Sequence, residues 1–156
     1  MKGTAALLAI FAVLATAQPV VAEEPECYDL KIRAKPVAQI PTEIIDDPDY
    51  IVMSWPWFID LEVERVLDGE FNEKKLTALA VLHTRYIAET RVYLLRRNML
   101  GGFNMLRPER PESLTRCDAG IEPMAPYIRP AEGQSLEDYR LAGEKAWADY
   151  LGYKKD

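Results

Sequence analysis

Residues 57–64 read WFIDLEVE, and this stretch decides the fold. Its odd-numbered positions are all apolar, whereas its even-numbered positions from Asp60 onward are acidic. Alternation with a period of two indicates a β-strand with one buried face and one solvated face. The phase of the alternation slips at residues 65–66, which predicts a β-bulge or a strong local twist. Residues 68–69, Asp-Gly, then supply a turn.

Similar short patterns lie on both sides of this stretch. Four prolines between residues 23 and 49 indicate that this part is irregular apart from one short strand. The predicted strands are 28–34, 50–53, 57–66, 76 to about 86, 92–97 and 103–107, with a glycine-containing hairpin loop at 98–102. We therefore expect a mainly β domain of about five strands, forming a small antiparallel barrel or an OB-like sheet.

One helix is expected near the C-terminus, after a Gly- and Pro-rich loop at 118–134. Ser135 can cap its start, with Asp138 at the third helical position. Apolar and small residues from Leu136 to Leu151 then form one stripe at helical spacing. Gly152 is placed to end the helix, so the expected helix covers about 136–151.

The first 22 residues have the three-part pattern of a secretory signal peptide. Lys2 is their only charged residue, an apolar stretch follows, and Val20-Val21-Ala22 is a small-residue cleavage signal. This apolar stretch is shorter than the ~20 residues needed to span a bilayer. We expect residues 23–156 to form a single periplasmic or secreted domain, without stable membrane insertion after cleavage.

The chain has two cysteines, Cys27 and Cys117. In an oxidising compartment such a pair predicts a structural disulfide. Closing a loop of this length stabilises the fold by up to about 4.6 kcal/mol in the chain-entropy model. A redox or metal-binding pair is the alternative, but the sequence contains no Cys-x-x-Cys motif.

Composition narrows the function. The formal net charge is −6, which argues against nucleic acid as a partner because phosphate binding needs a basic surface. His83 is the only histidine, and no Gly-x-Ser-x-Gly motif accompanies the few serines. We assign no catalytic residue, metal ligand or cofactor.

A resemblance is found in residues 63–70, VERVLDGE, in Tyr93-Leu94-Leu95 and in Gly102-Phe103-Asn104. These segments are similar to exported OB-fold modules related to netrin-like domains and tissue inhibitors of metalloproteinases. In that family a V-x-x-V-L-x-G segment ends a long strand, and a Y-L-L strand precedes a glycine-led one. The resemblance spans well under half of the chain and implies the fold alone. The inhibitors begin with a metal-chelating cysteine, whereas neither cleavage after Ala22 nor cleavage at the second possible site, Ala15-Thr16-Ala17, exposes Cys27.

The densest aromatic cluster is the main candidate for binding a ligand or partner. It consists of Tyr50, Trp55, Trp57 and Phe58. Trp is enriched at binding hot spots, although the shared phase of Trp55 and Trp57 also fits core packing. The leading hypothesis is a non-catalytic exported module that binds an envelope protein or glycan, with a purely structural accessory subunit as a further reading.

The alternative to a binding module is an enzyme, and this second hypothesis rests on charged residues. Asp60, Glu62 and Glu64 project from one strand face, so a small hydrolase that uses paired carboxylates on envelope polysaccharide is the second hypothesis. The simpler interpretation is a solvated strand face. A cluster of arginines at 85–97 is expected to pair with these carboxylates across strands rather than to bind anions.

Overall fold

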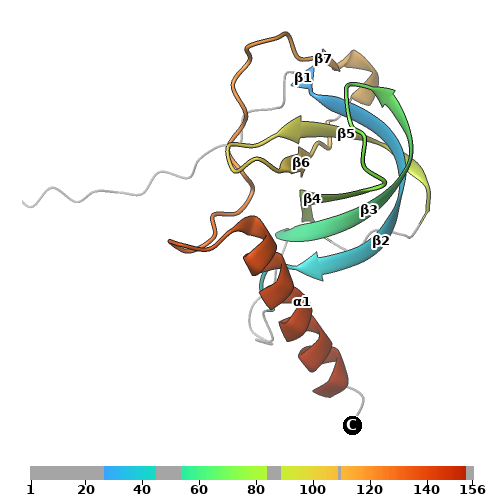
Figure 1. The fold of residues 1–156 in the computed structure, drawn as a ribbon. Coiled ribbons are helices and arrows are strands. Elements are labelled where there is room, and N and C mark those ends of the chain that lie inside the picture. Colours follow the sequence, from blue (N-terminus) through green and yellow to red (C-terminus); the bar gives the residue numbers. More distant parts are fainter. Residues whose placement is uncertain (1–26, 45–53, 84–88, 109, 154–156) are drawn as a thin grey trace, which may run out of the picture.

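The structure is a computed structural model that describes residues 27–44, 54–83, 89–108 and 110–153. Five strands close into a barrel in the order β2-β3-β4-β6-β5, with β5 returning to β2 (Figure 1). Only β4 and β6 run parallel among these described barrel strands. This order, in which the fifth barrel strand pairs with the third, is that of an OB-type Greek-key barrel. The strands are β2 (Leu30–Pro41), β3 (Trp55–Asp68), β4 (Lys75–Leu82), β5 (Arg91–Arg97) and β6 (Phe103–Met105).

The predicted alternation of β3 is confirmed. Ile59 and Leu61 are 0 % exposed inside the barrel, whereas Glu62 and Glu64 are exposed. Inward-facing residues of all five strands form one core with them. Burying apolar side chains stabilises a fold by about 25 cal/mol per Å² of surface removed from water, so this core accounts for the closed barrel.

The bulge expected at residues 65–66 is also confirmed. Arg33 of β2 pairs with Arg65, but the next residue, Ala34, pairs with Val63, so β3 has one extra residue between them. The bulge brings Val66 back onto the core. A turn follows at Gly69, where φ is +95° and an added Cβ would lie 2.6 Å from a backbone oxygen. Glycine is the residue that tolerates both conditions.

The expectation that prolines make residues 23–49 irregular is wrong for the described part. β2 continues through Pro36 to Pro41, paired with β3 throughout. Two features explain this. The register shifts between Pro36 and Ala38, leaving Val37 bulged outward and 51 % exposed. Pairing with β5 ends at Ala34, so the proline ring lies where β2 has a single neighbour, a position that prolines tolerate.

The predicted disulfide joins Cys27 to Cys117. It links β1 (Cys27–Tyr28) to β7 (Thr115–Arg116), two short strands that pair in parallel. The 3₁₀ turn η1 (Pro111–Ser113) precedes β7 in the chain. Buried Arg96 adds a second link, because it donates hydrogen bonds to the Asp29 carboxylate and the Glu122 carbonyl oxygen. The long loop before the helix is thereby held against the barrel.

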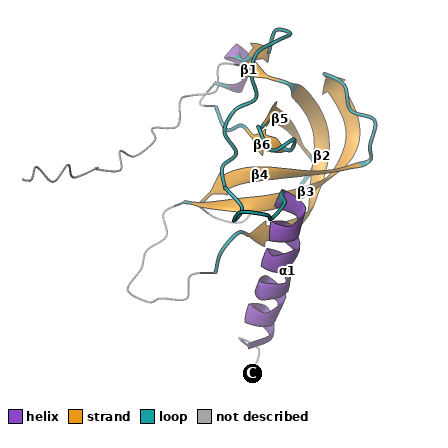
Figure 2. Cartoon of the chain, turned by 60° about the vertical axis from the view of Figure 1, so that its left-hand side comes forward, coloured by secondary structure: helices purple, strands orange, loops and turns teal. Residues whose placement is uncertain are grey.

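The helix α1 (Leu136–Tyr153) starts as predicted. The Ser135 hydroxyl accepts a hydrogen bond from the Asp138 amide at 3.1 Å, and the Asp138 carboxylate accepts from the Ser135 amide at 3.0 Å. Its end is not where Gly152 predicts, since α1 continues to Tyr153. Gly152 does not take the positive φ of a C-terminal cap. In both views the last turns of α1 extend beyond the barrel (Figures 1 and 2).

The first half of α1 covers a second, smaller apolar cluster on the outer face of the barrel, around Ile40, Phe58 and Leu79. Gly143 makes the closest approach, because an added Cβ would lie 2.8 Å from the Pro41 carbonyl oxygen. The described residues include no helix of the length and apolarity that crossing a membrane requires.

Candidate binding site

An aromatic cleft of about 220 Å³ lies between the end of the barrel and the second half of α1. It contains all three tryptophans of the chain, Trp55 and Trp57 from β3 and Trp147 from α1. Tyr150, one helical turn after Trp147, completes the aromatic wall. The remaining lining residues are Pro41, Glu43, Ile44, Leu82 and His83. We call this site the aromatic cleft.

The aromatic rings contact one another across the two elements. The Trp57 and Trp147 ring centroids lie 6.2 Å apart at an interplanar angle of 82°, an edge-to-face arrangement. Trp147 stacks on Tyr150 at 5.4 Å and 15°. Residues three apart on a helix share a face, so the spacing of Trp147 and Tyr150 builds the stack. Trp57 also packs on the barrel core.

Two polar atoms of the aromatic cleft residues stand out. The indole nitrogens of Trp55 and Trp57 are buried and make no hydrogen bond in the described structure. A buried donor without an acceptor costs about 1–3 kcal/mol, and buried tryptophans usually satisfy their N–H. Core packing alone does not explain why two neighbouring indole N–H groups are left without acceptors. A ligand that supplies the acceptors would explain it.

The described lining of the aromatic cleft has few charged side chains. Glu43 is the only carboxylate of the described lining, which contains no lysine or arginine. The Glu43 side chain is exposed and has no ion pair or hydrogen bond to other described residues. The described lining therefore offers hydrogen-bond donors, the Glu43 carboxylate as an acceptor, the polar groups of His83 and Tyr150, and aromatic surface.

The four candidate residues have different positions. Trp55 and Trp57 are half-buried and line the aromatic cleft. Phe58 is 2 % exposed under α1, where its ring lies 6.3 Å from that of Tyr139, and it does not line the aromatic cleft. Tyr50 lies outside the described residues, as do the predicted strand 50–53 and the predicted signal peptide. Sequence reasoning placed Trp147 on a helical stripe but gave it no part in binding.

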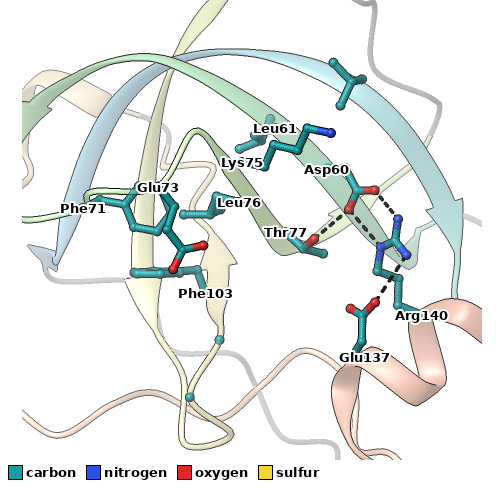
Figure 3. A pocket seen from close by; sticks show the side chains of 13 residues that line it. Asp60, Leu61, Phe71, Glu73, Lys75, Leu76, Thr77, Phe103, Glu137 and Arg140 are labelled. Atoms are coloured by element: carbon teal, nitrogen blue, oxygen red, sulfur yellow. Dashed lines mark hydrogen bonds and ion pairs between the residues drawn. The ribbon is translucent and has the colours of Figure 1, made fainter.

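A second, charged groove of about 490 Å³ opens between β4, the β5–β6 loop and the start of α1 (Figure 3). Asp60 of β3 lines this groove and accepts hydrogen bonds from Arg140 Nε at 3.0 Å and Thr77 Oγ1 at 2.7 Å. Burial opposes the ionisation of Asp60, but these two partners outweigh it and lower the pKa of the carboxyl. The ion pair with Arg140 fastens α1 to β3.

The β5–β6 loop that borders the charged groove is shaped by two buried asparagines. The Asn98 side-chain oxygen accepts hydrogen bonds from the amides of Leu100 and Gly102, both at 3.1 Å. Its amide nitrogen donates to the Asn104 oxygen at 3.1 Å. A satisfied buried network of this kind fixes one loop conformation.

The described arginines of this cluster, Arg91, Arg96 and Arg97, do not pair with the carboxylates of β3, so the cross-strand prediction is wrong for them. Arg85 lies outside the described residues. β2 lies between β5 and β3 in the barrel. Arg96 forms an ion pair with Asp29 instead. The Arg97 guanidinium lies 5.2 Å from the centroid of the Phe103 ring. Glu64 pairs with Arg33 of β2 at 3.3 Å. The order of the strands, which no local pattern specifies, decided these partners.

No protein-family model, no curated protein and no solved structure matches this chain. The resemblance to netrin-like modules therefore stays a prediction. Across the described ranges no group of three His, Cys, Asp or Glu side chains is arranged to hold a metal ion.

Proposed function

We propose that the protein is an exported, non-catalytic binding module of the cell envelope, and that the aromatic cleft is its binding site. The observation that carries the proposal is the pair of buried, unpartnered indole N–H groups in a cleft where three tryptophans meet. Clefts lined by aromatic side chains with a few polar groups are typical of ligand sites. The disulfide supports an oxidising compartment.

The position of the aromatic cleft on the fold supports the same proposal. OB-type barrels bind oligomeric ligands and proteins through the face of their second and third strands and the adjoining loops. Trp55 and Trp57 belong to the second barrel strand, Leu82 ends the third, and Pro41 ends the first. The fold is an analogy only, so the chemistry of the aromatic cleft carries the weight.

The experiment is capture from an envelope extract by the disulfide-bonded protein, exported and purified from cells that express the full chain. Proteins and sugars retained on the immobilised protein are quantified by mass spectrometry. Two variants of α1 are compared. Trp147→Ala removes one wall of the aromatic cleft, whereas Leu141→Ala removes a side chain that is 51 % exposed and outside it.

The proposal expects one or a few components whose capture is lost with Trp147→Ala and kept with Leu141→Ala. Circular dichroism confirms that both variants are folded. Capture that both variants retain at the wild-type level places binding elsewhere and contradicts the proposal. Recovery of a cleaved N-terminus in the purified protein tests export in the same preparation.

The carboxylate-dependent hydrolase is not favoured by the geometry. Asp60 is engaged by Arg140 and Thr77 and has a lowered pKa, whereas a glycosidase acid needs a raised one. Glu64 accepts hydrogen bonds from Arg33 and Thr90. These carboxylates therefore serve to join β3 to its neighbours.

A further inference from the structure

The groups of the aromatic cleft specify the chemistry of what fills it. The buried indole N–H groups of Trp55 and Trp57 lack acceptors, and the exposed Glu43 carboxylate can accept a hydrogen bond from a ligand. A purely apolar side chain would leave both indole groups unsatisfied. A quaternary ammonium ion would suit Glu43 and the aromatic faces, but it has no acceptor for the indoles. A hydroxyl group both donates and accepts, so a polyhydroxylated ligand satisfies each group.

The aromatic surface adds a second requirement. Trp147 and Tyr150 stack nearly parallel and meet Trp57 edge to face. This wall suits a ligand with a flat apolar face and polar edges. Sugar rings have that form, because their C–H groups gather on the ring faces while the hydroxyl groups project around the rim.

The size of the aromatic cleft limits how much of the ligand it holds. Its volume of about 220 Å³ lies below the roughly 300–1,000 Å³ of pockets that enclose drug-sized molecules. One ring fits, and the rest of an oligosaccharide must leave through the open side.

Charge decides between neutral and acidic sugars. The described lining has Glu43 and no lysine or arginine, and the chain has a net charge of −6. A uronic acid or a phosphorylated sugar would place a second negative charge near Glu43, and two like charges close together repel each other.

We infer that the aromatic cleft binds one ring of a neutral oligosaccharide, with sugar oxygens accepting from the indoles of Trp55 and Trp57 and a hydroxyl donating to Glu43. This inference rests on the proposed function. Because both indole nitrogens are buried, the sugar oxygens reach them only after the rings reorient. Binding therefore changes the surroundings of the tryptophans.

Tryptophan fluorescence is a direct assay, because all three tryptophans of the chain line the aromatic cleft. The disulfide-bonded protein is titrated with neutral tetrasaccharides of glucose, galactose, mannose and N-acetylglucosamine. Tetragalacturonate and choline chloride are titrated in parallel. We expect a saturable shift with at least one neutral tetrasaccharide and none with tetragalacturonate or choline at the same concentrations.

Three variants test the assignment. Trp147→Ala should weaken the neutral sugar by about tenfold or more, as removal of an aromatic hot spot does, while Leu141→Ala leaves it unchanged. Glu43→Gln, which keeps an oxygen acceptor, should change it by less than about threefold. A cation-binding cleft would behave oppositely, losing choline binding with Glu43→Gln.

The outcomes separate this inference from the proposed function. If no neutral sugar shifts the emission but the envelope extract does, the sugar inference is wrong and the binding module stands. Saturable binding of choline or of tetragalacturonate in preference to the neutral sugars also overturns the inference. If neither sugars nor extract change the emission, both the inference and the proposed function are wrong.

Discussion

A methyl group added at Gly143 would test how closely α1 packs on the barrel. An ideal Cβ there lies 2.8 Å from the carbonyl oxygen of Pro41 and 3.2 Å from Cγ2 of Ile40. The first contact is with backbone at the end of β2, which is paired with Trp57 of β3. A carbonyl oxygen held in a strand cannot turn aside as a side chain can, so the helix must move.

Two opposing effects set the change in the free energy of unfolding for Gly143→Ala. Alanine favours a helix interior over glycine by about 1 kcal/mol. Forcing an extra carbon into a packed contact costs about 1–3 kcal/mol, and a contact below 3.0 Å with backbone belongs at the upper end of that range. We therefore expect Gly143→Ala to lower the free energy of unfolding by about 1–2 kcal/mol, despite its better helix propensity.

Gly152→Ala is the matched control, because it lies in the same helix with nothing within 4 Å of an added Cβ. Only propensity acts there, so the change is neutral or stabilising by up to about 1 kcal/mol. Urea unfolding followed by circular dichroism measures both variants. The native emission of Gly143→Ala should also shift, as α1 moves Trp147 away from Trp57. Equal stabilisation by both substitutions would refute the docking of α1 on β2.

Three other perturbations have definite outcomes. Because the pKa of Asp60 is lowered from 3.8 in the folded protein, its stabilisation is complete above that value and is lost as the pH falls through the lower folded pKa. Asp60→Asn weakens the charged hydrogen bonds to Arg140 and Thr77 and should therefore cost about 1.5–3 kcal/mol at pH 7. This difference from wild type should shrink in urea melts near pH 2; a cost independent of pH, or one matched by Glu62→Gln, would contradict this. Reducing the Cys27–Cys117 bond should lower the free energy of unfolding by up to about 4.6 kcal/mol, measured by thermal melts with and without reductant, and an unchanged melting temperature would show that it contributes nothing. Asn98→Ala leaves two loop amides without their acceptor and should cost about 1–3 kcal/mol, with faster hydrogen exchange at those amides as the check; unchanged exchange would exclude the proposed role of the network.

Local patterns were sufficient where neighbours in the chain decide the structure. The alternation at residues 57–64 predicted β3, the phase slip at 65–66 predicted its bulge, and Ser135 predicted the start of α1. Each of these depends on contacts within a few residues, or on which face of a strand is buried. The two cysteines predicted a disulfide because an oxidising compartment leaves few alternatives.

Long-range placement was beyond these patterns. Trp57 and Trp147 are 90 positions apart, and the ion pair of Asp60 and Arg140 spans 80. Nothing local indicates which strand face a helix will cover. The prolines of β2 misled for the same reason, because a bulge and a missing neighbour strand are features of the assembled sheet. The binding candidates Trp55 and Trp57 thus form only one side of the aromatic cleft. The helical residues on its other side were predicted only to pack against the barrel.

The most direct test of the aromatic cleft as the binding site is a two-dimensional ¹⁵N–¹H spectrum of the tryptophan indoles. The protein is ¹⁵N-labelled, disulfide-bonded and titrated with unlabelled envelope extract. Three indole resonances are expected from three tryptophans. We predict that those of Trp55 and Trp57 move downfield as their N–H groups gain acceptors, while amides of the charged groove stay in place. Unmoved indoles with shifts at Thr77 and its neighbours would place binding in the charged groove and contradict the account.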